Sequence, residues 1–328
     1  MKIDILHTAL HCNVLRVFRQ WRMWIAEFAI GETLVGRAIG PPNLDIQQEI
    51  SMLNQNTANT VQDTKGAFII GGSRGIGQAS VRALARDGHD IAFTYNTNED
   101  SAIETAREVE AMGRRCFYFQ ADMGDKDAPQ RAVQQAIERL GRIDALVTVA
   151  GITRWNHTAD LTEEKIDELY TCDYRAVLLC TAGVARHMID KKIKGSIVHI
   201  SSVHAHAAWA HDGIYGGLKA AINRTTESEA LDLSLYGIRV NCVSPGMTNV
   251  HRPDTPEFLE REWAHKVPLG RFGTAGDVAE AIAFLVSDRA SYITGVTLKV
   301  DGGMSLPAMN DDSSPEAGYG WDKRRMQP

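Results

Sequence analysis

The sequence contains few cysteines, and none of them has the spacing of a recognised motif. Only five of the 328 residues are cysteine, and no Cys-x-x-Cys pair occurs. Scattered cysteines argue against a disulfide framework and a thiolate zinc site, and they suit a reducing compartment. The sequence also lacks a basic patch with interleaved aromatic residues, which argues against a nucleic-acid partner. We therefore expect a cytoplasmic protein that acts without nucleic acid.

Residues 1–51 lack the apolar continuity of a membrane span, so we expect no stable membrane insertion. They carry an apolar stripe at helical spacing, with arginines between its members. The stripe consists of Val14, Phe18, Trp21, Ile25 and Phe28, and the arginines are Arg16, Arg19 and Arg22. This pattern suits organelle targeting by residues 1–30, an interfacial anchor, or a dispensable extension, which we favour. A polar arm follows over residues 52–65.

Between residues 66 and 306, short apolar runs alternate with helical patterns. Hydrophobic residues make up 44% of the chain, which is enough for a sizeable core. We predict strands at 67–70, 91–96, 116–122, 143–151, 195–200, 238–246 and 296–303. We predict helices at 78–88, 101–113, 128–141, 161–190 (with a bend) and 215–236. The alternation predicts one doubly wound α/β domain with a parallel sheet, followed by a polar tail over 307–328.

The stretch from Ser201 to Lys219 is the strongest candidate for a catalytic site. Tyr215 and Lys219 are four residues apart and share one helix face, and Ser202 lies on the preceding loop. These residues follow a predicted strand, and α/β sheets hold their ligands at the carboxyl ends of strands. A free tyrosine is a poor base at neutral pH, but a neighbouring ammonium favours the phenolate. We predict that Tyr215 is an acid/base, supported by Lys219, and that Ser202 orients the substrate oxygen.

The segment GGSRGIG (71–77) lies between a predicted strand and a predicted helix. Glycines allow a tight turn close to a pyrophosphate, and a helix N-terminus favours its negative charge. The acidic residue that usually binds the ribose hydroxyls of NAD is absent from residues 94–97. Arg74, in contrast, can face a 2′-phosphate. We therefore predict that the cofactor is NADP(H), with NAD(H) as the alternative.

These features together resemble the short-chain dehydrogenase/reductase family over about residues 65–306. The resemblance implies a Rossmann-type fold, hydride transfer to or from a carbonyl or alcohol, and a homotetramer. It also implies that the serine, tyrosine and lysine of the family correspond to Ser202, Tyr215 and Lys219. The implied cofactor site consists of Gly71, Ser73, Arg74, Gly75, Ile76, Gly77, Tyr95, Asp122, Met123, Ala150, Gly151, Tyr215, Lys219, Pro245, Gly246 and Thr248.

Three positions depart from the pattern of that family. Its Asn-Asn-Ala-Gly motif matches Thr148-Val149-Ala150-Gly151. Its catalytic asparagine, which holds a bent helix and a proton-relay water, falls on Asp173. An aspartate keeps the hydrogen-bond acceptors but brings a charge to the relay. We therefore keep two hypotheses, an active enzyme with Asp173 in its catalytic set and a cofactor-binding regulator or scaffold that no longer turns over.

Two stretches, 193–209 and 292–309, are similar to the bacterial glucose dehydrogenases. That resemblance implies that His204 and Trp209 contact a sugar substrate. A ketoreductase acting on another polyol, a steroid or an acyl substrate stays open. Residues 250–268 suit a lid over the substrate or, alternatively, an ordinary pair of surface helices.

Several histidines gather on and near one predicted loop, which invites a metal-site interpretation. They are His199, His204, His206 and His211, with His157 further away. No carboxylate or cysteine ligand has a matching spacing, and the implied reaction needs no metal. We therefore expect no metal site.

Overall fold

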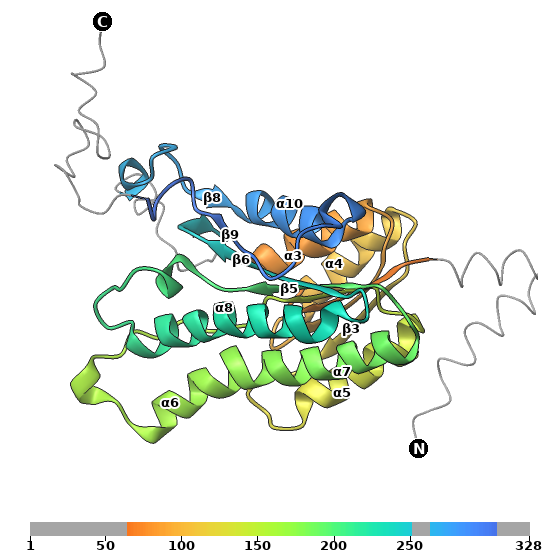
Figure 1. Ribbon diagram of the computed structural model, residues 1–328, viewed down its shortest axis with the longest axis horizontal. Helices are drawn as coiled ribbons and strands as arrows, with labels where there is room; N and C mark the ends of the chain where they lie inside the picture. Colours follow the sequence, from red (N-terminus) through yellow and green to blue (C-terminus); the bar gives the residue numbers. More distant parts are fainter. Residues whose placement is uncertain (1–63, 251–262, 307–328) are drawn as a thin grey trace, which may run out of the picture. The chain divides into compact units, whose positions relative to one another are not determined.

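The structure, a computed structural model, describes residues 64–250 and 263–306 (Figure 1). These residues belong to one compact unit, Asp63–Pro328. Four predicted segments lie wholly or mostly outside the described residues. They are the extension over 1–51, the arm over 52–65 except its last two residues, the lid over 250–268 except residues 250 and 263–268, and the tail over 307–328.

Seven parallel strands form the central sheet. They are β1 (Gly66–Ile70), β2 (Asp90–Tyr95), β3 (Cys116–Gln120), β4 (Ala145–Thr148), β5 (Ser196–Ile200), β6 (Arg239–Pro245) and β9 (Thr297–Val300). Their order in the sheet is β3-β2-β1-β4-β5-β6-β9. Because β1 lies between β2 and β4, the direction of winding reverses there, and ligands of such sheets bind in the crevice at this point. The predicted doubly wound α/β fold is confirmed.

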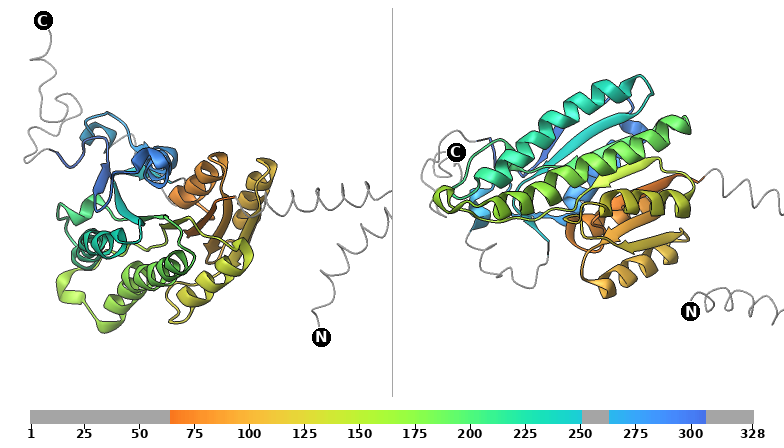
Figure 2. Two further views of the ribbon diagram at one scale, coloured as in Figure 1. Left: turned by 45° about the vertical axis from the view of Figure 1, so that its right-hand side comes forward. Right: turned by 90° about the horizontal axis from the view of Figure 1, so that it is seen from below.

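Helices cover both faces of the sheet, which explains why the central strands read as continuous apolar runs. One layer contains α3 (Gly75–Arg86), α4 (Glu99–Ala111) and α10 (Ala275–Val286), and the other contains α5 (Ala128–Leu140), α7 (Ala176–Asp190) and α8 (Gly213–Ser234) (Figures 1 and 2). Each layer packs its own apolar cluster against the strands. Every residue of β1 and β5 is buried between the two layers.

The predicted helices and strands differ from the observed ones mainly at their ends. Strands β3, β4 and β9 are shorter than predicted, because their hydrogen-bonded ladders stop where the chain turns into loops. Helix α10 was not among the helices predicted from the sequence. Its signal was the capping box at its start, in which the Thr274 side chain accepts from Asp277 N and the Asp277 side chain accepts from Thr274 N.

The predicted bend in the segment 161–190 is present. Helix α6 (Glu163–Tyr170) joins α7 through η2 (Thr171–Arg175), a single π-helical turn. Such a turn inserts an extra residue into the helix and is frequent at functional sites. In this protein it directs Asp173 into the interior, where the residue is completely buried.

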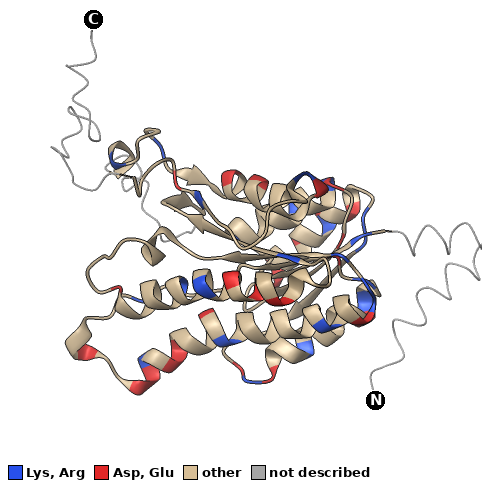
Figure 3. Cartoon of the chain, viewed as in Figure 1, with Lys and Arg blue, Asp and Glu red and all other residues tan. Residues whose placement is uncertain are grey.

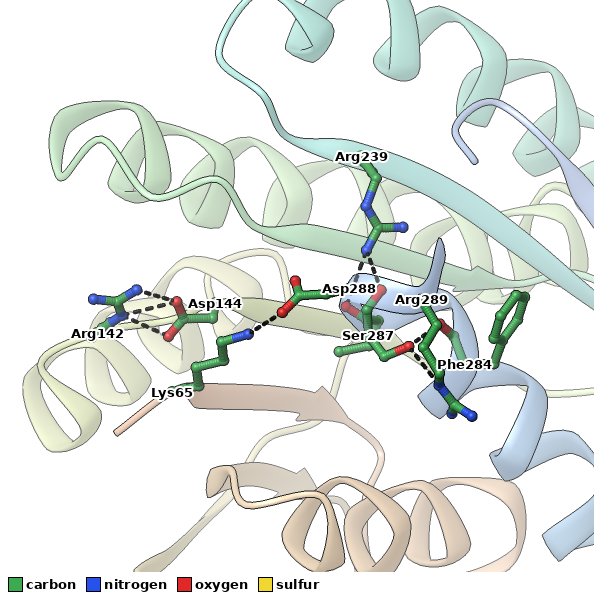
Figure 4. A network of polar contacts seen from close by, with 9 residues as sticks. Lys65, Arg142, Asp144, Arg239, Phe284, Ser287, Asp288 and Arg289 are labelled. Atoms are coloured by element: carbon green, nitrogen blue, oxygen red, sulfur yellow. Dashed lines mark hydrogen bonds and ion pairs between the residues drawn. The ribbon is translucent and has the colours of Figure 1, made fainter. Parts of the chain in front are cut away.

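Polar contacts tie the elements together at the amino ends of the strands (Figure 4). The Asp144 carboxylate accepts from Gly66 N at 2.9 Å and from the Arg142 guanidinium. The Arg239 guanidinium donates to the carbonyls of Leu285 at 2.7 Å and Val286 at 3.0 Å. These carbonyls lie at the end of α10, where a helix has no partners of its own for them. The contacts stabilise the end of the sheet at which the parallel strands begin.

Charged residues of both signs are interspersed along the helices in the view of Figure 3. Acidic residues gather on α6, whose first turn contains Glu163 and Glu164. No helix within the described ranges is long and apolar enough to cross a membrane.

Candidate active site

A cavity of about 690 Å³ opens at the carboxyl ends of the central strands. Loops that follow β1, β2, β3, β4, β5 and β6 all contribute to its wall. Of the residues predicted for the site, all except Gly77 line this cavity. Further residues at its wall were not selected from the sequence, among them Thr94, Trp155 and Met304.

The loop between β1 and α3 is shaped to approach a ligand closely. Gly71 and Gly75 have φ values of +86° and +54°, which favour glycine. A Cβ atom at Gly77 would lie 1.8 Å from the carbonyl oxygen of Gly71, so only glycine allows the helix to pack there. Thr94 Oγ1 accepts from Gly71 N at 2.9 Å and fixes the start of the loop.

The N-terminus of α3 suits the pyrophosphate of a dinucleotide. The side chain of its N-cap residue, Arg74, forms no capping hydrogen bond within the described residues, and its first turn contains no acidic residue. Its first backbone N–H groups therefore have no side-chain acceptor and present the positive end of the helix dipole. Ser73 is held against α4, because Ser101 Oγ donates to its carbonyl at 2.6 Å. These features fit a bound NAD(P)(H) molecule.

Arg74 stands at the junction between this cavity and a larger, open cavity of about 1330 Å³. The three other arginines of the open cavity are already neutralised, since Arg82 pairs with Glu108, Arg86 with Glu280 and Arg114 with Asp90. Arg74 forms no ion pair with any residue in the described parts of the chain. Its guanidinium is therefore free for an anionic ligand. Tyr95, at the end of β2, lines the cavity of about 690 Å³.

The remaining predicted cofactor residues follow β3, β4 and β6. Asp122 Oδ1 accepts from Gly124 N at 2.9 Å, which shapes the turn after β3. Gly151 allows close packing, because a Cβ atom there would lie 2.9 Å from Asp173 Oδ2. Thr248 Oγ1 donates to the Gly246 carbonyl at 3.0 Å and closes the turn after β6.

The predicted catalytic trio meets at the centre of the cavity. Ser202 follows β5, and its Oγ accepts from His204 N at 3.2 Å, which leaves its own proton available for a ligand. Tyr215 and Lys219 lie in the first turns of α8, with Lys219 Nζ 5.5 Å from the centre of the Tyr215 ring. Ser201 Oγ donates to the Lys219 carbonyl at 2.9 Å and ties α8 to the end of β5.

Asp173 lies directly beside Lys219. Its Oδ1 accepts from Ile152 N at 2.7 Å. Its Oδ2 lies 3.2 Å from Lys219 Nζ, at ion-pair distance but outside hydrogen-bond geometry. Burial lowers the pKa of Lys219, but the charges of Asp173 and Tyr215 outweigh this, so that the pKa is raised and the ammonium stays charged at neutral pH. The resemblance implies that this position holds a bent helix and a relay water, which stays a prediction, and the Asp173 carboxylate in addition contacts the lysine.

Thr148, which stands where the family has its first asparagine, belongs to a buried series of polar contacts. Thr148 Oγ1 lies 2.9 Å from His199 Nδ1, and His199 Nε2 lies 2.8 Å from Glu229 Oε2. Both ring nitrogens of His199 are thus satisfied by protein atoms. Within the described part of the chain, no group of three or more histidine, cysteine or acidic side chains is arranged to hold a metal ion.

The outer part of the cavity is aromatic. His204 stacks on Trp209 with ring centres 4.1 Å apart, and Trp155 lies 5.8 Å from His204. His204 and Trp209 were predicted from the sequence, whereas Trp155, which stands on the loop after β4, was not. It also missed Asp212, whose Oδ2 lies 2.8 Å from His204 Nδ1.

Comparison with known proteins agrees with this arrangement. A family model described as enoyl-(acyl carrier protein) reductase matches residues 70–305. The 3-oxoacyl-[acyl-carrier-protein] reductase of Staphylococcus aureus is 34% identical over 244 residues, 74% of this chain and 99% of that protein. The L-rhamnose 1-dehydrogenase (NAD(P)(+)) of a Sphingomonas species is 32% identical over 243 residues, 73% of this chain and 96% of that protein.

Solved structures extend the similarity to three dimensions. The acetoin dehydrogenase of Salmonella typhimurium matches with a TM-score of 0.71 and 34% identity, and the match covers 75% of this chain and 99% of that chain. The chain belongs to the short-chain dehydrogenase/reductase family, as its motifs predicted. It is therefore an NAD(P)-dependent oxidoreductase that acts on a small molecule.

Proposed function

We propose that this oxidoreductase transfers hydride reversibly between NADP(H) and a carbonyl or secondary alcohol, with Tyr215 as the acid/base. One observation supports this most strongly. Tyr215, Ser202 and a buried, charged Lys219 line the same cavity as the glycine-rich loop. A proton donor, an orienting hydroxyl and a fixed positive charge are the groups that carbonyl reduction requires of a protein.

Each residue of the trio has its own task in this proposal. The Tyr215 hydroxyl gives its proton to the carbonyl oxygen in reduction and takes it back in oxidation. Ser202 donates a hydrogen bond to the same substrate oxygen. Lys219 keeps a positive charge beside the phenol and binds the nicotinamide ribose. The cofactor, when bound, supplies or accepts the hydride.

The assay that tests the proposal measures NADPH and NADH oxidation, and the reverse reductions, with the full chain. The panel contains sugars, polyols, ketones and acyl thioesters. We expect turnover with at least one class and a dependence on added carbonyl or alcohol. Bound cofactor without turnover across the whole panel would contradict the proposal.

Arg74 supports NADP(H) as the preferred cofactor, because it is the cavity arginine without an ion pair in the described residues. We expect Arg74→Ala to raise KM for NADPH roughly 10- to 100-fold, since a charge-assisted hydrogen bond to the 2′-phosphate contributes about 1.5–3 kcal/mol. KM for NADH should change much less. Steady-state kinetics with both cofactors measure this, and Arg139→Ala, on the exposed face of α5, is the matched control. An equal loss with both cofactors would refute the NADP(H) preference.

The substrate is proposed from the cavity wall and the relatives together. Similar proteins are named for a 3-oxoacyl thioester, for L-rhamnose and for acetoin. The predicted contacts His204 and Trp209 favour a sugar or another polar substrate with a face that can stack, as the glucose dehydrogenase resemblance implies. A keto or acyl substrate is the alternative, and the panel separates the two.

A second function, cofactor binding without turnover, is favoured by one observation. The Asp173 carboxylate already engages the Lys219 ammonium, and it competes with the support that Lys219 gives to Tyr215. The complete trio argues for the enzyme, because a regulator has no chemical need for all three groups.

We further propose that residues 66–306 form the catalytic domain, that 1–51 are an extension joined by the arm 52–65, and that 307–328 are a tail.

The family resemblance implies a homotetramer paired through the long helices and β9. Large exposed apolar side chains on α8 and near the edge strand β9 support such contacts, namely Leu231, Leu235, Tyr292 and Leu298. The described cysteines are free thiols, which supports the cytoplasmic location expected from their scatter.

A further inference from the structure

The outer part of the cavity contains a histidine–carboxylate pair that the catalytic trio does not use. His204 lies on η3 (Val203–Ala205), directly after Ser202, and Asp212 is the residue before α8. His204 Nδ1 and Asp212 Oδ2 are 2.8 Å apart. The His204 ring stands edge-on to Tyr215, with ring centres 5.5 Å apart. His204 therefore lies next to the proposed acid/base at the cavity wall, with Asp212 behind it.

Asp212 determines which nitrogen of His204 is available to a ligand. The carboxylate accepts a hydrogen bond, so it places the proton of a neutral imidazole on Nδ1 and leaves Nε2 as an acceptor. Asp212 is only 4% exposed, and its other oxygen, Oδ1, has no hydrogen-bond partner within the described residues. Burying a carboxylate with so few partners lowers stability, and a carboxylate bonded to one nitrogen of an imidazole fixes its tautomer and orientation. We assign Asp212 as a positioning residue for His204.

A comparison with His199 separates this arrangement from an ordinary structural histidine. His199 is 1% exposed, and both of its nitrogens are bonded to protein atoms. The His204 side chain is 18% exposed and lines the cavity, and the hydrogen bonds of the described residues leave its Nε2 without a partner. An acceptor held in place at a cavity wall is the arrangement that recognises a donor on a ligand.

The distances indicate where that donor lies on the substrate. The reacting oxygen must contact Tyr215, and the ring centres of His204 and Tyr215 are 5.5 Å apart, so a substrate group that meets His204 lies close to the reacting carbon. Trp209 supports the His204 ring from one side, and Trp155 offers a further aromatic face near it. These two tryptophans suit the apolar face of a cyclic polyol or a short carbon chain.

We propose that His204 Nε2 accepts a hydrogen bond from a hydroxyl on the carbon next to the reacting carbon, so that the enzyme selects vicinal diols and α-hydroxy ketones over substrates with a single oxygen. This inference rests on the proposed function. Cyclic sugars that react at the anomeric carbon belong to this class, and so does acetoin, whereas the 3-oxoacyl thioesters do not.

The test uses matched substrate pairs with the full chain. The first pair is 3-hydroxybutan-2-one and butan-2-one with NADPH, and the second is cyclohexane-1,2-diol and cyclohexanol with NADP⁺. We expect wild-type kcat/KM to favour the dioxygenated member by about tenfold or more, because an enzyme group left without its substrate hydroxyl loses that binding energy.

Three variants identify the residues responsible for the preference. His204→Phe keeps a ring against Trp209 but removes the acceptor, and we expect the ratio of the two kcat/KM values to fall about tenfold. Asp212→Asn no longer dictates the tautomer, so the ratio should fall as well. His206→Phe, an exposed histidine on the same loop that does not line the cavity, should leave the ratio unchanged.

The outcomes distinguish this inference from the proposed function. Turnover of both members with no wild-type preference would overturn the inference and leave the proposed function standing. An equal loss for both members in His204→Phe would also overturn it, since it would indicate a general structural role. No turnover of any panel substrate would overturn the proposed function and the inference together.

Discussion

Replacing Tyr215 with phenylalanine is expected to lower kcat by about 10²- to 10⁴-fold, the usual range for loss of a general acid/base. The phenyl ring keeps the van der Waals contacts with His204 and Lys219, so the cavity should retain its shape. The variant loses the hydroxyl that exchanges the proton with the substrate oxygen. Steady-state kinetics with the best substrate of the panel measure this change.

Two controls separate a chemical effect from a structural one. Binding of NADPH to Tyr215→Phe, measured by fluorescence titration, should stay within a few-fold of wild type. Tyr170→Phe, which removes a hydroxyl from an exposed position on α6, should retain full activity. If Tyr215→Phe kept most of its kcat, the proton would have to come from another group, and the assignment of Tyr215 would be wrong.

Replacing Lys219 with methionine is expected to lower both activity and stability. The change removes the ammonium from a buried ion pair and leaves the carboxylate of Asp173, which is 0% exposed, without its counter-ion. Breaking such a pair from one side typically lowers the free energy of unfolding by about 3–5 kcal/mol. Urea unfolding of wild type and variant at pH 7 measures the loss, and kinetics measure the activity.

A double variant distinguishes the two roles of Lys219. In Lys219→Met/Asp173→Asn no buried charge remains uncompensated, so most of the lost stability should return while activity stays low. Asp173→Asn alone keeps the hydrogen bond from Ile152 N but leaves the buried Lys219 ammonium without its counter-ion, so it should lose stability while it remains active. Equal destabilisation of the single and double variants would contradict an ion pair as the cause.

The pH dependence of the pair follows from the raised pKa of Lys219. A basic group with a raised pKa in the folded state contributes stability that is fully present below its unfolded pKa, about 10.4. The contribution disappears only as the pH rises through the folded pKa. The stability difference between wild type and the double variant should therefore be constant from neutral pH to about pH 10 and decrease above it.

Asp173→Asn also tests how the carboxylate influences the reaction. The carboxylate offsets the ammonium charge that favours the phenolate of Tyr215. Its removal leaves a net positive charge beside the tyrosine. The pH–rate profile of alcohol oxidation should therefore move towards lower pH in this variant, and an unchanged profile would indicate that Asp173 acts only on structure.

Much of this protein could be derived from local patterns in the sequence. The alternation of apolar runs and helical periodicity determined the fold class, because strands covered on both faces and helices covered on one leave different patterns. The glycine-rich segment and the Tyr215–Lys219 spacing marked the candidate site, because backbone freedom and helix geometry act over a few residues. The boundaries were less accurate, since they depend on where neighbouring strands stop pairing.

Only the tertiary structure decided which distant residues meet. Asp173 contacts Lys219 because a π-helical turn directs it inwards, and Thr148 bonds to His199 because β4 and β5 are neighbours in register. Asp212 reaches His204 because the loop after β5 folds back onto the start of α8. The sequence by itself determined the chemistry that each segment can offer. The arrangement of the strands and of the bent helix decided the charge beside Lys219 and the orientation of His204, because these depend on contacts between segments far apart in the chain.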